Sequence, residues 1–520
     1  MMADMTTRTT SKKKVLFISF SMMHHGIDVI SKSISGKYDP ELLIFLDFGD
    51  FEIVYDQSHK KSLDLKKICK LCSGFDYVAV SANSMNKRIA FLLCDSIKKK
   101  TGAKVILGGY LGITEPEESI RHCDYVCVWE GEYLSGLLDA IESGKNPDIL
   151  VNFISKDPAA VTILKSADFN GKKNWDNPGI AQYKRYYFYK DGDVSAFSDF
   201  RSSRFEIQTI RGCAHNCTFC SNFLINDIKD KNHMRRVQKK DMHKLLGELC
   251  SVPEHCSRIT IVDDNFFLRS EVELHSFVNE YLKHNKDKEL NIEVDMRSAD
   301  FLRKLREVSR IPKINVSTGI QSGSERFRKE IYNRDISDKR IIGLISGIGS
   351  LRKRRPALNM IYEFITMNPL EKENDLIDTI NLMLKLDGKI FVYAYVNFPR
   401  TSISFKKNNE YIMKRTDFAH SGKSDCSNGS GFLFSVSNDE FNRFPYYYFY
   451  MNLISVFKKN GLGFLLPKKY EPGIFSDLLN MRIFSGIYSS LIRLSYIRGQ
   501  AGYTNSIRKE LEMNYMFREY

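Results

Sequence analysis

The sequence predicts an α/β protein built from two successive repeats of strand and helix, followed by a mostly helical C-terminal region. Short apolar runs of strand length alternate with longer segments whose apolar residues recur three and four positions apart. This alternation occurs twice, and the two repeats are separated by a stretch rich in turn-forming residues. With 520 residues and 43% hydrophobic composition, the chain can bury substantial cores.

The first repeat predicts a doubly wound parallel sheet over residues 1–146. Segments 62–72 and 86–100 have helix spacing and lie between predicted strands. Gly108 and Gly109 directly follow a strand, where ligands of such sheets lie; they would let a flat cofactor approach the backbone, or serve turn geometry alone. The strands are predicted at 15–20, 41–48, 77–82, 104–109 and 124–129.

Residues 147–204 collect turn formers and predict a linker, after which the second repeat occupies 205–405. Six strand-helix units predict a partial or full α/β barrel. Ser270 and Glu273 have the spacing of a capping box, so a helix should begin there. Residues 406–520 predict a helical accessory region. The six strands are predicted at 205–210, 258–264, 290–296, 314–320, 357–365 and 389–396.

Charge and cysteine content constrain the partners and the compartment. The net charge of +14 favours an acidic partner, such as a phosphorylated or carboxylated small molecule, nucleic acid or an anionic membrane surface, or it reflects a solvated lysine-rich surface. The sequence has no apolar run long enough for a transmembrane helix and no secretory signal, which predicts a cytoplasmic protein and leaves peripheral membrane contact open. Eleven scattered cysteines are expected to be reduced there.

Three cysteines stand together in a single loop: Cys213, Cys217 and Cys220 follow the first strand of the second repeat. Three thiolates on a four-iron cluster would leave one iron open to a substrate or cofactor. The amino and carboxylate groups of S-adenosylmethionine suit that iron. The alternative is a zinc site completed by His215 or a distant cysteine, although no second pair of closely spaced cysteines lies downstream.

The loop RGCAHNCTFC resembles the CxxxCxxC signature of the radical S-adenosylmethionine superfamily, and the later strand ends are similar to that family's barrel. The resemblance implies a [4Fe–4S] cluster on the three cysteines, with Phe219 near the adenine of S-adenosylmethionine. It further implies Gln321 and Ser322 near the ribose and Arg297 facing the carboxylate. Alternatively, Gln321 and Ser322 cap a helix, and Arg297 pairs with Asp295 or Asp300.

The N-terminal region resembles the Rossmann-like, flavodoxin-like cobalamin-binding domain that precedes the barrel in one branch of the superfamily. The similar text is VILGGYLGITEPEESIRHCDYVCVWEGEYLSGLLDAI, in which Gly108, Gly109, Gly131 and Glu132 match positions of the family pattern. An Asp-x-His-x-x-G motif is absent, so the sequence marks no lower-axial histidine, and Tyr110 replaces a frequent proline.

This resemblance implies cobalamin-dependent methylation of an unactivated carbon or phosphorus centre in a biosynthetic intermediate. A radical rearrangement or cyclisation without methylation is the alternative within the superfamily. The implied partners are a small-molecule substrate, which the net charge suggests is anionic, and an electron donor such as flavodoxin or ferredoxin, with no stable nucleic-acid partner. A zinc-containing protein that binds nucleic acid or a membrane surface is the alternative from another class.

Asp263 and Asp264 are candidates for acid-base or polar structural roles. The sequence identifies no catalytic residue.

Overall fold

The fold is that of a computed structural model, in which the chain divides into two compact units. The first comprises residues 1–48 and 62–200, and the second comprises residues 49–61 and 201–520. The structure describes residues 12–21, 24–45, 65–84, 86–144, 153–155, 183–190, 192–197, 202–231, 233–366, 368, 370–395, 401 and 445–470.

Five parallel strands form the centre of the first unit, in the order β2-β1-β3-β4-β5. This order is typical of flavodoxin-like sheets and confirms the predicted doubly wound fold. The strands lie under helices on both sides, and the last five residues of β1 are all buried. The strands are β1 (Lys14–Ser19), β2 (Asp39–Phe45), β3 (Tyr77–Ser81), β4 (Lys104–Gly108) and β5 (Tyr125–Cys127).

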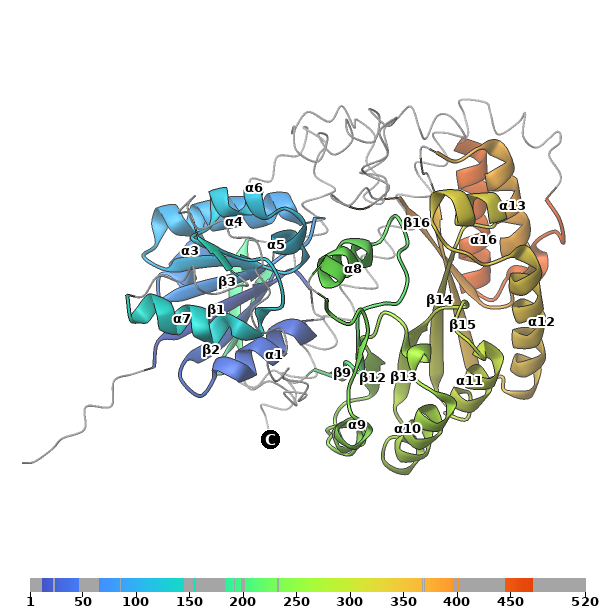
Figure 1. Cartoon of the computed structure of the whole chain (residues 1–520), viewed down its shortest axis with the longest axis horizontal. Helices are drawn as coiled ribbons and strands as arrows, with labels where there is room; N and C mark the ends of the chain where they lie inside the picture. Colours follow the sequence, from blue (N-terminus) through green and yellow to red (C-terminus); the bar gives the residue numbers. More distant parts are fainter. Residues whose placement is uncertain are drawn as a thin grey trace, which may run out of the picture. The chain divides into compact units, whose positions relative to one another are not determined.

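The helices of this unit pack in two groups (Figure 1): α1 lies beside α7, and α4 lies between α3 and α6. Cys72 and Cys123 are buried within this packing, as expected for structural thiols. The helices are α1 (His25–Ile34), α3 (Lys66–Cys72), α4 (Lys87–Lys100), α5 (Tyr110–Thr114), α6 (Pro116–His122) and α7 (Leu134–Glu142), with a 3-10 turn, η1, at Gly131–Tyr133.

The segment 147–204, predicted as a linker, instead contributes three strands to the first sheet. β6 (Phe153–Ser155) pairs antiparallel with β5, and β7 (Tyr186–Lys190) pairs parallel with β2. β8 (Asp193–Phe197) then folds back onto β7 through a turn in which Gly192 has φ 79°. The turn formers therefore close a hairpin, and its aromatic strand extends the sheet. Residues 156–182 of the predicted linker lie outside the described residues.

The second unit is built on six parallel strands that lie side by side in chain order, β9-β12-β13-β14-β15-β16. Among the described residues β9 and β16 do not pair, so this is the partial form of the predicted barrel. The strands are β9 (Arg204–Ile207), β12 (Arg258–Ile261), β13 (Glu289–Val294), β14 (Ile314–Gln321), β15 (Leu358–Thr366) and β16 (Lys389–Ala394).

Helices alternate with these strands and cover one face of the sheet (Figure 1). The predicted capping box is confirmed at α10, where the Ser270 hydroxyl accepts from the Glu273 amide and the Glu273 carboxylate accepts from the Ser270 amide. The helices are α8 (Ser221–Lys231), α9 (Met242–Cys250), α10 (Glu271–His284), α11 (Phe301–Val308), α12 (Asp338–Arg354) and α13 (Glu373–Lys385).

The opposite, concave face of the sheet is polar near the start of the strands. Asn291, Asn315 and Asn359 occupy neighbouring register positions on β13, β14 and β15. Each amide donates to the next residue along the row: Asn359 to Asn315 at 2.6 Å, and Asn315 to Asn291 at 2.7 Å. This hydrogen-bonded row links β13, β14 and β15 near their amino ends.

The helix α16 (Pro445–Lys459) packs against β16 and α13. The Ser455 hydroxyl donates to the Ile390 carbonyl at 2.7 Å, and the Lys458 ammonium donates to the Leu386 carbonyl at 2.6 Å. This part of the C-terminal region therefore covers the β16 edge of the sheet. The rest of the predicted accessory region, apart from residues 460–470, lies outside the described residues. Within the described part of the chain, no helix meets the length and apolarity that crossing a membrane requires.

Candidate functional site

The three clustered cysteines lie on the loop between β10 (Ile210–Arg211) and α8, at the carboxyl end of β9. Cys217 is buried, and Cys213 and Cys220 are partly exposed. Gly212 begins the loop with φ 85°, and a Cβ there would lie 2.2 Å from the Arg236 carbonyl oxygen. Only glycine fits this position without strain.

Two buried polar side chains hold the ends of this loop. Asp263 accepts hydrogen bonds from the backbone amides of Thr209 and Ile210 at 2.6 and 2.8 Å. Asn226 on α8 donates to the carbonyl oxygens of Cys213 at 3.0 Å and His215 at 3.1 Å. Asp263 therefore has the polar structural role that the sequence left open. The sequence did not identify Asn226. The only signal for it would have been a polar residue on the face of α8 that is buried in the structure.

A second set of contacts fastens the middle of the loop to residues 331–333. The Thr218 amide donates to the Tyr332 carbonyl at 3.1 Å, and its hydroxyl donates to the Ile331 carbonyl at 2.6 Å. The Asn333 amide side chain donates to the Asn216 carbonyl at 2.8 Å, and Asn333 adopts φ 52°, a left-handed conformation that asparagine tolerates. The cysteine loop is thus bound along its length to a segment more than a hundred positions away.

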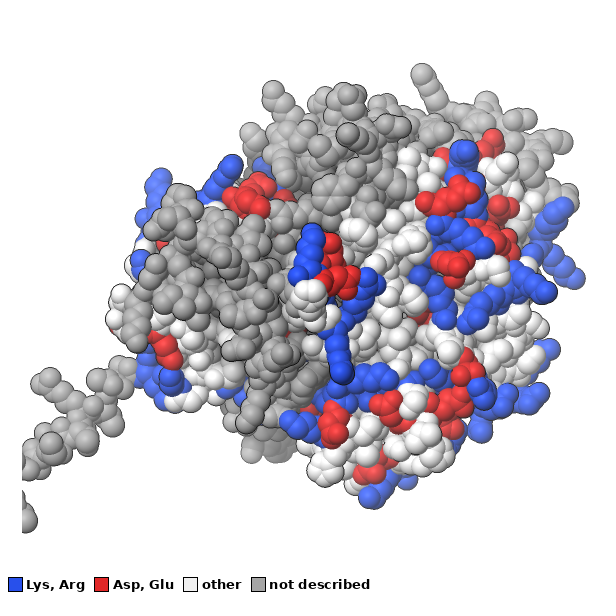
Figure 2. Space-filling model, in the orientation of Figure 1, with Lys and Arg blue, Asp and Glu red and all other residues white. Residues whose placement is uncertain are grey.

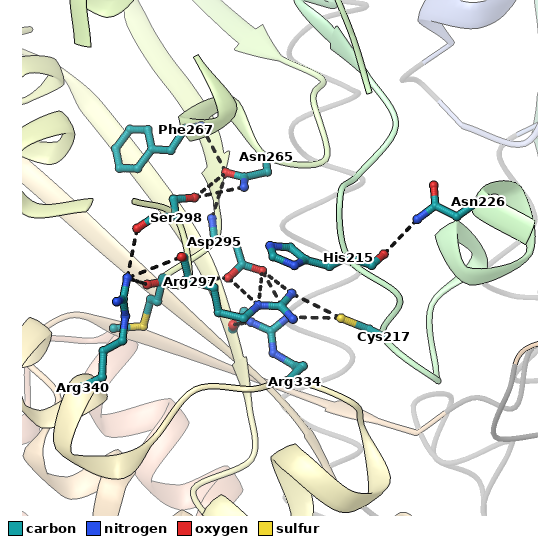
Figure 3. Close-up of polar contacts among 12 residues, drawn as sticks. His215, Cys217, Asn226, Asn265, Phe267, Asp295, Arg297, Ser298, Arg334 and Arg340 are labelled. Carbon is teal, nitrogen blue, oxygen red and sulfur yellow. Dashed lines mark hydrogen bonds and ion pairs between the residues drawn. The ribbon is translucent and has the colours of Figure 1, made fainter. Parts of the chain in front are cut away.

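The cysteines differ in their surroundings. Burial raises the pKa of Cys213 to about 12 and that of Cys220 to about 11, and electrostatic repulsion from Cys217 raises both pKa values further. Cys217 faces two guanidinium groups: Arg297 Nη2 lies 3.3 Å and Arg334 Nη1 lies 3.7 Å from its sulfur (Figure 3). Cys217 is therefore the cysteine whose thiolate the protein compensates by charge.

Both arginines share one carboxylate, Asp295, which directly follows β13. Arg297 Nη2 lies 2.7 Å and Arg334 Nη1 lies 3.3 Å from Asp295 Oδ2 (Figure 3). The two guanidinium groups and the hydrogen bonds outweigh burial and hold the pKa of Asp295 well below its usual range. Arg297 thus forms the ion pair with Asp295 that the sequence left as an alternative, and Asp300 pairs with Arg303 instead.

Phe219 lies in an aromatic cluster rather than free in the lumen. Its ring is edge-on to Tyr332 with the centroids 4.7 Å apart, and Phe327 and Tyr395 belong to the same cluster. The segment 327–333, which contains a short π-helix, η5 (Phe327–Ile331), therefore contacts the cysteine loop through both rings and backbone. A contact between Phe219 and adenine stays a prediction.

Gln321 and Ser322 end β14 in different environments. Gln321 has φ 74°, at the point where the register between β14 and β15 shifts, and its side chain folds over Gly319. Ser322 is 1% exposed, and its hydroxyl accepts from the Ser324 amide at 3.2 Å. The Ser322 hydroxyl thus makes a local turn contact, whereas it is the Ser324 hydroxyl that accepts from the Phe327 amide at the start of the following helix. The ribose contact stays a prediction for both Gln321 and Ser322.

In the first unit, the predicted glycines lie at the carboxyl ends of β4 and β5. Gly109 has φ 77°, and a Cβ there would lie 2.5 Å from the Ala82 carbonyl oxygen. At Gly131 a Cβ would lie 2.5 Å from the Ile30 side chain. Both glycines are thus explained by close packing of the chain itself. Gly108 ends β4, and Glu132 lies in the η1 turn; their contact with cobalamin, like that of Gly109 and Gly131, stays a prediction.

Carboxylates line the lumen above the asparagine row. Glu293 lies on β13 and Glu363 on β15, and burial together with the charge of Glu363 raises the pKa of Glu293 to about 7. Asp264 accepts from Asn222 at 2.9 Å and also acts on Glu293. Asp263 and Asp264 therefore diverge: the first is buried behind the cysteine loop, and the second is exposed on the lumen side.

Six parallel strands, a cysteine loop at their carboxyl end and arginines against the central cysteine define the class of this domain. Residues 207–383 match the family model of the radical SAM superfamily, so this part of the chain is a radical SAM domain and the protein is an enzyme. No curated protein matches the chain.

About three quarters of the chain is similar in fold to solved structures of the radical S-adenosylmethionine methyltransferase TsrM from Kitasatospora setae. One, with tryptophan substrate and the S-adenosylmethionine analogue aza-SAM bound, matches at 14% identity and a TM-score of 0.54, over 76% of this chain and 76% of that chain. The other, with cobalamin and a [4Fe-4S] cluster bound, matches at 15% identity and a TM-score of 0.53, over 76% and 74%. At this identity the likeness shows a shared fold.

Proposed function

We propose that the protein cleaves S-adenosylmethionine reductively at a [4Fe–4S] cluster and methylates an unactivated carbon or phosphorus centre of a small biosynthetic intermediate with the help of cobalamin. The observation that carries the first part is the loop of Cys213, Cys217 and Cys220, fixed at the carboxyl end of a parallel sheet where barrel enzymes hold their active sites. The radical SAM domain match supports the same interpretation.

The geometry of the loop favours a cluster over a single zinc ion. Tetrahedral zinc with Zn–S bonds of about 2.3 Å brings its sulfur ligands to about 3.8 Å from one another. Within the described residues, the group of metal-binding side chains whose ligand atoms all lie within 4.8 Å is Cys250, Glu280 and His284 on the surface, and the loop cysteines form no such group. A four-iron cluster holds each thiolate on a different iron, so it does not require the sulfurs to share one metal ion.

The residues of the site have distinct proposed roles. The three cysteines would each ligate one iron and leave a fourth iron open for the cofactor's amino and carboxylate groups. When bound, the cluster supplies the electron that cleaves S-adenosylmethionine into methionine and a 5′-deoxyadenosyl radical. Phe219 would lie against the adenine and Gln321 near the ribose, and Arg297, held in place by Asp295, would face the carboxylate.

The proposal of a cobalamin domain depends on the fold of the first unit. Its strand order is that of flavodoxin-like domains, which bind ligands beyond the carboxyl ends of the strands. The similar TsrM structure was solved with cobalamin bound. When bound, cobalamin would supply the methyl group, and Gly108, Gly109, Gly131 and Glu132 would contribute to its pocket.

Partner and compartment follow from the same proposal. The proposed chemistry requires a small-molecule substrate and an electron donor such as a flavodoxin or ferredoxin. The cysteines of the described part of the chain form no disulfide with one another, which suits the reducing cytoplasm. The lumen carboxylates Glu293 and Glu363 disfavour an anionic group deep in the barrel, so we place any such group of the substrate near the arginines. Figure 2 shows Lys and Arg interspersed with Asp and Glu over the visible described surface, which gives no support to a nucleic-acid partner.

The test is anaerobic reconstitution with iron, sulfide and cobalamin, followed by incubation with methyl-labelled S-adenosylmethionine, a reductant and candidate substrates. We expect a brown protein, deoxyadenosine, and label in the product. Cys217→Ala should abolish deoxyadenosine, while Cys256→Ala, a buried cysteine outside the loop, should leave it unchanged. Product without label would favour the non-methylating rearrangement or cyclisation, and one zinc per chain without iron would overturn the proposal.

A further inference from the structure

We propose that Arg334 is a positioning residue of the cluster site: its guanidinium group, together with Arg297, sets the reduction potential of the cluster through the sulfur of Cys217. This inference rests on the proposed function. Arg334 lies 117 positions from Cys217 in the sequence, but its Nη1 lies 3.7 Å from the Cys217 sulfur. No motif of the cysteine loop includes it.

The position of Arg334 is tightly determined. Its side chain is almost fully buried, and its Nη2 donates to the Gly319 carbonyl at 2.6 Å while its Nη1 lies 3.3 Å from Asp295 Oδ2. Its backbone amide donates to the Arg328 carbonyl at 2.7 Å. The guanidinium plane is therefore held by β14 on one side and by the residue after β13 on the other (Figure 3). It cannot swing away to solvent without breaking these contacts.

One polar atom of Arg334 has no partner. Its Nε is buried and makes no hydrogen bond among the described residues. A buried donor without a partner costs free energy, and such groups are retained where another requirement determines the side chain's placement. Here the placement brings Nη1 toward the Cys217 sulfur, which is the contact that would serve a function.

Charge explains what the contact does. Arg297 and Arg334 together carry two positive charges, and Asp295 supplies one negative charge between them. This group of three therefore has one excess positive charge next to Cys217, and a Cys217 thiolate would balance it. Cys213 and Cys220 differ, because their sulfurs accept backbone amides of their own loop and neighbouring helix instead. The protein thus places its positive charge on one specific cluster ligand.

An excess positive charge beside a ligand sulfur stabilises the reduced, more negative state of an iron-sulfur cluster. Hydrogen bonds to the sulfurs and net charge are recognised determinants of cluster potentials. Arg297 is the nearer of the two arginines, but it is also the one placed to meet the cofactor carboxylate. Arg334 instead donates to Gly319 and pairs with Asp295, so its substitution tests the effect on the sulfur apart from the cofactor contact proposed for Arg297.

The experiment compares the cluster's midpoint potential in the full-length reconstituted protein and in three variants, by redox titration followed with electron paramagnetic resonance. Arg334→Gln removes the charge, and Arg334→Lys keeps the charge without the planar fork. Arg326→Gln is the matched control, because Arg326 lies in the same segment but pairs with Asp375, away from the sulfur. Iron content and circular dichroism verify that each variant is loaded and folded.

In Arg334→Gln we expect the ratio of reduced to oxidised cluster, measured at the wild-type midpoint, to fall about tenfold, since a hydrogen bond from a charged group contributes at least that factor. The same ratio should fall by a smaller factor in Arg334→Lys, and in Arg326→Gln it should equal that of the wild type. A loaded Arg334→Gln with the wild-type midpoint would overturn the inference; if that variant takes up no iron, a wild-type midpoint in a loaded Arg334→Met, which also lacks the charge, would do so. A wild-type protein that assembles no cluster would instead refute the proposed function.

Discussion

Replacing Asp295 by asparagine tests the charge arrangement of the site in the protein without a cluster. Asp295 is 8% exposed and accepts from Arg297 Nε at 3.0 Å, from Arg297 Nη2 at 2.7 Å and from the Arg297 amide at 2.8 Å, and it also pairs with Arg334. The asparagine side chain would keep the shape but leave two buried guanidinium groups without a counter-charge. Breaking a buried ion pair in this way costs about 3–5 kcal/mol.

The assay is urea unfolding under anaerobic conditions with a chelator present, followed by far-ultraviolet circular dichroism. The matched control is Asp300→Asn, because Asp300 pairs with Arg303 on the surface and asparagine tolerates its left-handed φ of 55°. That exposed pair should contribute less than about 1 kcal/mol. If Asp295→Asn unfolds at the same urea concentration as Asp300→Asn, the reasoning about the buried charges is wrong.

The pH dependence gives a second check on the same variant. The pKa of Asp295 is lower in the folded than in the unfolded protein, so the unfolded state binds its proton first as the pH falls. Its stabilising contribution is therefore complete above the unfolded pKa of about 3.9 and is lost as the pH falls toward the folded pKa. The stability difference between wild type and Asp295→Asn should accordingly be constant at neutral pH and shrink below about pH 4.

Three further predictions concern the loop, a helix cap and the lumen. Gly212→Ala should reduce the iron bound after reconstitution, because the residue has a left-handed φ and no room for a Cβ. Gly247→Ala is the control, since Gly247 has open space around it and the variant should bind iron normally. Equal iron content in the two variants would contradict the argument. Ser270→Ala should lower the free energy of unfolding by about 1 kcal/mol through loss of the capping box, whereas Ser276→Ala on the exposed face of the same helix should change it little; equal urea midpoints would refute the cap's contribution. Because the pKa of Glu293 is raised to about 7, the folded protein should lose stability as the pH rises from about 5 to about 8. Glu293→Gln should remove this loss. If the melting temperatures of the wild type and of Glu293→Gln change in parallel with pH, the expectation is refuted.

The sequence predicted those parts of the protein whose physical cause is local. The strands of both sheets were recognisable because buried strands in parallel sheets are short apolar runs, and the capping box at Ser270 because its two hydrogen bonds join residues three apart. The spacing of Cys213, Cys217 and Cys220 predicted a shared site for the same reason, since one loop brings them together. The paired turn residues before β8 were misread as a linker because a hairpin and a linker use the same residue types.

Only the tertiary structure decided which residues surround the cysteines. Asp263, Asn226 and Arg334 reach the loop from different elements, and Arg334 does so across 117 positions of sequence. Contacts of this kind depend on the order of the strands, on their register and on where each chain segment turns at the strand ends. Residue spacing along the chain carries none of that information, so the sequence identified the sulfur ligands and only the folded sheet showed which charges lie beside them.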